Sequence, residues 1–151
     1  MGKKRNIAQI VELFMLFAIL LMVITVITVT FVTTRNKSTY ARDLTEAVCA
    51  AEQVTEISMS SYDEDELSEL LERADSIDIV TVANSAGRQE YILEVGMSEE
   101  GGGRLYTVVL TREEEKGTGG KYIDSHTDVS LKGSDSVLYS LDSGKYIEEG
   151  R

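Results

Sequence analysis

Three side chains with ligand or acid–base chemistry alternate along one short stretch, Asp124-Ser-His-Thr-Asp128. In a β-strand every second side chain points to the same face, so Asp124, His126 and Asp128 are expected to lie together. One imidazole and two carboxylates could hold a divalent cation. The solvent-facing positions of an edge strand show the same alternation, and we favour that interpretation. No metal ion or other cofactor is predicted.

Other candidate sites carry weaker signals. The acidic run Asp63–Glu66 lacks the spaced ligands and central glycine of a calcium loop and is typical of a first helical turn. Gly117–Lys121 lacks the spacing of a phosphate loop and indicates a hairpin turn. The chain has one histidine and no G-x-S-x-G sequence, and its one cysteine, Cys49, is expected to pack rather than to react. The protein is therefore not predicted to be an enzyme.

A further acidic group, Glu12, stands at the start of an apolar run. Residues 13–31 carry no charged side chain. An acid at the centre of a bilayer costs roughly 2.5–3.5 kcal/mol on insertion scales, and less near the interface. Two explanations remain open. The side chain of Glu12 reaches the headgroups, or it meets a positive partner inside an assembly.

The apolar run, residues 7–32, predicts a transmembrane helix, because a helix of this length exceeds the roughly 30 Å of a bilayer core. We favour a retained helix over a cleaved secretory signal, whose apolar region is usually about 7–15 residues long before a small-x-small site. Lys3, Lys4 and Arg5 precede the run, which predicts that residues 1–6 lie in the cytoplasm and that the chain after the transmembrane helix lies outside the cell membrane. The lipid bilayer is thus an expected partner of residues 7–32.

The part that follows is strongly acidic. After residue 37 the chain has 25 acidic and ten basic side chains. This balance excludes nucleic acid and anionic headgroups as favoured partners. The length suffices for one small domain.

A helical pattern continues beyond the apolar run. No glycine or proline interrupts it, and residues 33–59 are predicted to form an amphipathic helix that continues the transmembrane one. Its apolar side chains recur every three or four positions and define a packing stripe: Tyr40, Leu44, Ala47, Val48, Ala51, Val54 and Ile57.

Residues 60–151 are predicted to form an α+β domain. Ser60–Glu66 indicates a helix stop, a cap and an acidic first turn of a short helix. Alternating residues separated by NSAG, EEGGG and EKGTGG then predict successive antiparallel hairpins. The predicted strands are Ile77–Val82, Gln89–Val95, Leu105–Thr111, Lys121–Leu131, Ser136–Leu141 and, after Ser143-Gly, Lys145–Ile147. The tetrapeptide GKYI occurs at 120–123 and 144–147, and each copy is interpreted as a glycine turn that leads into a strand.

The N-terminal region resembles a type IV pilin-like protein, specifically a minor pilin or pseudopilin of a type II secretion or type IV pilus-like system. The resemblance covers about residues 3–56. It rests on the basic Lys3-Lys-Arg, on Gln9-Ile-Val-Glu12 at the start of an apolar run, and on the pattern A-x-x-L-x-x-A-x-x-x-A-E from Ala41 to Glu52.

The resemblance implies a long N-terminal helix whose outer half packs on a small antiparallel sheet. It also implies that the carboxylate of Glu12 pairs with the N-terminal amine of a neighbouring subunit after cleavage before Ala8. The residue before that cut is Ile7, where the family has glycine. Either an unusual leader is processed or the protein stays uncleaved.

These observations predict a membrane-anchored structural subunit of a bacterial surface filament or secretion pseudopilus. It would assemble through Glu12, Lys3, Lys4, Arg5 and the helical stripe, and its expected partners are other pilin-like subunits and the membrane assembly platform. The alternative is a single-pass membrane protein whose extracytoplasmic domain binds a ligand or partner, as in a sensor or adaptor.

Overall fold

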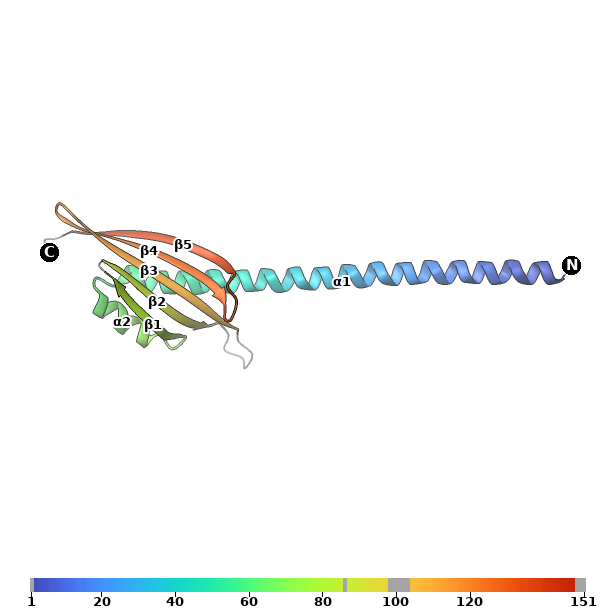
Figure 1. Cartoon of the computed structure of the whole chain (residues 1–151), viewed down its shortest axis with the longest axis horizontal. Coiled ribbons are helices and arrows are strands. Elements are labelled where there is room, and N and C mark those ends of the chain that lie inside the picture. Colours follow the sequence, from blue (N-terminus) through green and yellow to red (C-terminus); the bar gives the residue numbers. More distant parts are fainter. Residues whose placement is uncertain (1, 86, 98–103, 149–151) are drawn as a thin grey trace. The chain divides into compact units, whose positions relative to one another are not determined.

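The computed structural model describes residues 2–85, 87–97 and 104–148, and for residues 2–9 the backbone alone. Two helices precede five strands (Figure 1). Their bounds are α1 (Gly2–Ser60), α2 (Glu64–Arg73), β1 (Ile77–Ser85), β2 (Arg88–Gly96), β3 (Leu105–Gly117), β4 (Gly120–Leu131) and β5 (Val137–Glu148). The chain divides into two units, Met1–Ala41 and Arg42–Arg151. The predicted α+β class, a long N-terminal helix with an antiparallel sheet, is confirmed.

The five strands form one antiparallel sheet in the order β1-β2-β3-β4-β5, so each strand pairs with its neighbour in sequence. β3 runs to Gly117, beyond the predicted end at Thr111, because its charged end pairs with the start of β4 and the hairpin closes only at Gly119, where φ is +102°. The predicted EEGGG turn lies outside the described residues.

The interpretation of the second GKYI copy as a turn is wrong, because β5 runs without a break through Ser143 and Gly144. The two copies pair with each other: Tyr122 lies opposite Tyr146. A Cβ on Gly144 would overlap the hydroxyl of Tyr122, and one on Gly120 would lie 2.6 Å from the hydroxyl of Tyr146. Each glycine thus makes room for the tyrosine of the other copy.

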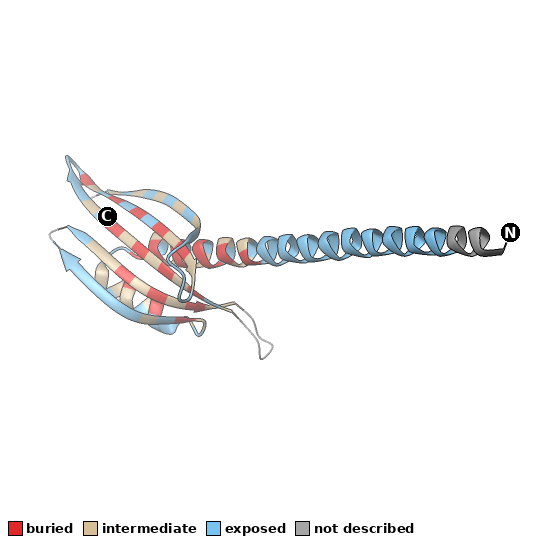
Figure 2. Ribbon diagram, turned by 45° about the vertical axis from the view of Figure 1, so that its right-hand side comes forward, coloured by how far each residue is buried: buried red, intermediate tan, exposed pale blue. Residues whose placement is uncertain are grey.

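One face of the sheet, here called the closed face, packs against α2 and the last turns of α1. Its buried side chains alternate with exposed ones along the strands, as Figure 2 shows. The core contains Ala47, Ala50, Ala51, Val54, Leu67, Leu71, Ile77, Tyr91, Leu93, Val95, Tyr106, Val108, Leu110 and Val129. The opposite side, the open face, has no helix packed against it among the described residues.

α2 begins where the sequence predicts a cap. The Asp63 carboxylate accepts a hydrogen bond from the Glu66 backbone N–H at 2.9 Å, and the Glu66 carboxylate accepts one from the Tyr62 N–H at 2.7 Å. These two bonds satisfy N–H groups that no helical turn reaches. Leu67 and Leu71, one turn apart, are then both buried in the core.

Candidate functional site

The apolar part of α1 presents its side chains outward. One helix, within the described residues, is long and apolar enough to cross a membrane by length and composition. From Ile10 to Val32 the large apolar side chains are exposed, with Leu13, Phe14 and Met22 at 68%, 71% and 71%. Contact of such a surface with lipid or with other helices is favourable, and its exposure to water is unfavourable.

Glu12 lies within this exposed apolar surface. Among the described residues no side chain pairs with it. Lys3, Lys4 and Arg5 belong to α1, but their side chains lie outside the described residues. Among the described residues of this chain, the structure therefore shows no partner for Glu12.

Threonine hydroxyls in the same segment are satisfied locally. Thr25, Thr28 and Thr30 each donate a hydrogen bond to the backbone carbonyl four residues earlier, at 2.8 Å. A polar group in hydrocarbon needs such a partner, and the helix supplies it. Glu12 differs from these threonines because a carboxylate can only accept, and its own helix offers no free donor at that point.

The buried side of α1 is turned slightly from the predicted stripe. Of the predicted residues, Ala47, Ala51 and Val54 are buried, Leu44, Val48 and Ile57 are half-buried, and Tyr40 is 58% exposed. The buried positions also include polar ones that apolar periodicity does not reveal: Asp43, Thr55 and Ser58. Cys49 is exposed, so the expectation that it packs is wrong within this chain.

The polar groups buried on α1 have partners on the sheet. The hydroxyls of Thr55 and Thr127 lie 3.0 Å apart, and those of Ser58 and Ser125 lie 2.9 Å apart. Small side chains on both elements allow the helix and strand β4 to approach closely. A hydroxyl buried without a partner would cost free energy, so these pairs fix the position of the helix along the strand.

The start of the packed part of α1 is held by charged groups. Glu46 accepts hydrogen bonds from Arg42 Nε at 2.7 Å and from the Tyr106 hydroxyl at 2.8 Å. The bond from Arg42 lowers the pKa of Glu46. Burial, together with the Glu46 carboxylate, raises the pKa of Tyr106. Arg104 pairs with the buried Asp43 next to them.

The end of α1 is held by cations from the closed face. Lys121 Nζ donates to the carbonyl of Tyr62 at 2.7 Å, and Lys145 Nζ donates to those of Met59, at 2.8 Å, and Ser61. Both lysines occupy the second position of a GKYI copy. Met59 belongs to the last turn of α1, and Ser61 and Tyr62 directly follow its end. Carbonyls at the C-terminal end of a helix carry partial negative charge and lack helical partners, so ammonium groups are favourable there.

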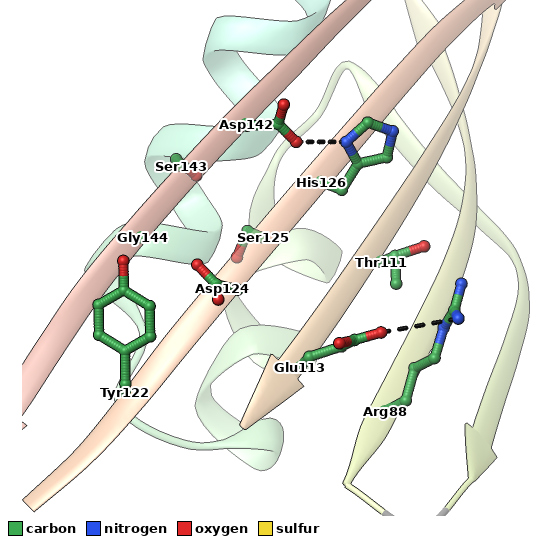
Figure 3. Close-up of a pocket in the computed structure, with 10 residues that line it drawn as sticks. All are labelled: Arg88, Thr111, Glu113, Tyr122, Asp124, Ser125, His126, Asp142, Ser143 and Gly144. Atoms are coloured by element: carbon green, nitrogen blue, oxygen red, sulfur yellow. Dashed lines mark hydrogen bonds and ion pairs between the residues drawn. The ribbon is translucent and has the colours of Figure 1, made fainter. Parts of the chain in front are cut away.

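On the open face, His126 lies between two carboxylates. Its Nδ1 is 2.5 Å from Asp142 of β5, and its Nε2 is 3.2 Å from Asp128 of its own strand (Figure 3 shows the first contact). The hydrogen bond with Asp142 is the main reason that the pKa of His126 is raised. Only the imidazolium can donate from both nitrogens, so this arrangement favours the protonated ring.

An open hollow of about 580 Å³ surrounds this histidine on the open face. It is lined by side chains of β2–β5, among them Asp124, Tyr122 and the pair formed by Arg88 and Glu113 at 3.6 Å (Figure 3). The sequence places Asp124 and His126 here by strand alternation. It does not reveal Asp142, because only the register of β4 against β5 brings that residue opposite His126.

The geometry argues against the divalent cation considered for Asp124, His126 and Asp128. Both nitrogens of His126 face carboxylates at hydrogen-bond distance, whereas a metal needs a free imidazole nitrogen. In the described part of the chain, no group of three histidine, cysteine or acidic residues could hold a metal ion.

The chain is an α+β protein, and among the described residues it has one helix that is long and apolar enough to cross a membrane. Comparisons of the chain with protein families, with curated proteins and with solved structures found no match.

Proposed function

We propose that the chain is a membrane-anchored, pilin-like structural subunit of a bacterial surface filament or secretion pseudopilus. One observation supports this most: α1 joins a segment with exposed apolar side chains, which contains Glu12, to a segment packed on an antiparallel sheet. Helix packing of the first segment against other subunits would bury the exposed apolar surface. The role is structural and not catalytic.

In this proposal Glu12 pairs with a cation of a neighbouring subunit, either its N-terminal amine or one of Lys3, Lys4 and Arg5. Opposite charges within about 4–6 Å favour the ionised acid, and scarce water strengthens their attraction. A subunit would then be retained when its acid and the neighbour's cation align. Residues 1–6 would lie in the cytoplasm and the sheet domain outside the cell membrane.

The test uses two differently tagged copies of the full chain, expressed together and purified through one tag. Glu12→Gln keeps the shape of the side chain and removes its charge. We expect it to insert in the membrane but to lower recovery of the second copy about tenfold, which corresponds to roughly 1.4 kcal/mol. Glu52→Gln, which removes an exposed charge from the other part of α1, should leave recovery unchanged.

Equal recovery of Glu12→Gln and the parent would mean that the acid only reaches the headgroups. The N-terminus of the mature protein adds a second criterion. A free or methylated amine at Ala8 supports the filament subunit, and an intact leader favours the alternative.

The alternative, a single-pass protein with an extracytoplasmic ligand- or partner-binding domain, is favoured by a different observation. The hollow lies on the open face of the sheet domain, whereas α1 packs against the closed face. A sensor or adaptor would use this surface and would not need Glu12.

A further inference from the structure

The open face of β2–β5 is a sheet surface on which no other described segment of the chain packs, and it has a marked excess of carboxylates. Strand alternation and the register place the following acidic residues on it: Glu90, Glu94, Glu113, Glu115, Asp124, Asp128, Asp142 and Glu148. Arg88 and His126 are the strand residues of this face that can carry positive charge. Neighbouring like charges raise the free energy of a surface, so a cationic partner would stabilise it.

Contacts within the chain neutralise part of this charge. Arg88 pairs with Glu113, and Lys132 pairs with Glu94 at 2.7 Å. His126 forms ion pairs with Asp128 and Asp142 when its ring is protonated. Within the described residues, Glu90, Glu115, Asp124 and Glu148 have neither an ion pair nor a side-chain hydrogen bond. Asp124 is the one of these four that lines the hollow.

Asp124 has a glycine opposite it on the neighbouring strand and an exposed tyrosine beside it. Gly144, directly opposite on β5, has no side chain, and the hydroxyl of Tyr122 lies over it. The Tyr122 side chain, which lines the hollow in Figure 3, is 42% exposed, and Tyr146, its partner on β5, is 56% exposed. A cation over the face of a tyrosine ring is attracted to it, and a carboxylate nearby strengthens the site.

We propose that the open face of β3–β5 docks a segment of a partner protein that carries lysine or arginine. One such side chain enters the hollow, where its cation meets Asp124 and the ring of Tyr122. Charge complementarity selects this occupant. A second copy of the acidic domain, nucleic acid and anionic headgroups would all be repelled.

This inference is independent of how α1 assembles, because it uses groups of the sheet alone. The experiment uses the full chain in nanodiscs of zwitterionic phosphatidylcholine and an octalysine peptide as the probe, with binding followed by NMR at low salt. We expect the largest shifts at Asp124, His126 and Tyr122. Asp124→Asn should weaken binding about three- to fivefold, the size expected for one exposed ion pair.

The matched control is Glu72→Gln, which removes the same charge from an exposed position of α2. It should leave the affinity unchanged. Asp124→Asn removes no hydrogen bond or ion pair between described residues, so we expect an unchanged circular dichroism spectrum, which checks that the fold is intact.

Three outcomes would overturn the proposal. Equal weakening by both variants would mean general attraction to an acidic protein. Binding of an octaglutamate peptide at the same residues would contradict the charge argument. Displacement of the peptide by calcium at stoichiometric concentration, with the same dependence on Asp124, would make the hollow a metal site.

Discussion

The two faces of the sheet are made by alternate residues of the same strands, yet they follow different physical rules. Val108 on the closed face is fully buried, and Val109, the next residue on β3, points to the open face and is half-buried. On the closed face a buried polar group without a partner in the protein costs free energy. On the open face water supplies that partner, and charges accumulate there. The closed face therefore determines stability, whereas the open face is available for recognition.

The comparison also shows how α1 is held. The helix meets the closed face through small side chains and paired hydroxyls, and three cations of that face, Arg112, Lys121 and Lys145, lie around its end. Arg112 is fully buried and donates to the Ser61 hydroxyl at 2.8 Å. Buried charges are stable only with such partners.

The largest expected effect is a difference in stability between substitutions on the two faces of β3. Val108→Thr keeps the shape of the side chain but buries a hydroxyl, and we expect it to lower the free energy of unfolding by about 2 kcal/mol. Val109→Thr should change it by less than about 0.5 kcal/mol, because water reaches that position. Urea unfolding of the full chain in detergent, followed by tyrosine fluorescence, measures both. Equal losses would remove the distinction between the faces.

A smaller effect is expected at the end of α1. Lys145→Met keeps most of the apolar stem and removes the hydrogen bonds to the Met59 and Ser61 carbonyls, so it should destabilise the domain by about 1 kcal/mol. The pKa of Lys145 is lowered because its ammonium group is partly removed from water. Lys132→Met is the control, since its exposed pair with Glu94 should contribute a few tenths of a kcal/mol at most. If the two variants unfold alike, the lysine does not stabilise the helix end.

The smallest effect concerns pH and the open face. The raised pKa of His126 means that its ion pairs stabilise the fold fully below about pH 6.5, the pKa of an unfolded histidine, and that this contribution is lost as pH rises through the folded value. The His126 side chain is 46% exposed, so the resulting change in the free energy of unfolding should stay below about 1 kcal/mol. His126→Gln should abolish that step in urea titrations between pH 5 and about 9, and an unaltered step would assign it to another group.

Much of this architecture could be predicted from local patterns. The apolar run, the stripe that follows it and the Asp63 cap predict helices, and turn residues between alternating segments predict hairpins. These signals depend on residues close in sequence, so they need no knowledge of the fold. The ability of the N-terminal segment to span a membrane can also be predicted from local sequence, because it depends on the length and composition of that segment.

Other features depend on residues far apart in sequence, and no local pattern reveals them. The Gly144 copy of GKYI has the composition of a turn, but pairing with the first copy keeps it within β5. The partners of Thr55 and Ser58, and the position of Asp142 beside His126, follow only from the register between elements. The sequence thus determined which segments are helices and strands, because backbone propensity and periodicity are local. The tertiary structure alone decided which polar groups are paired, because hydrogen bonds and ion pairs need atoms within about 3–4 Å of each other.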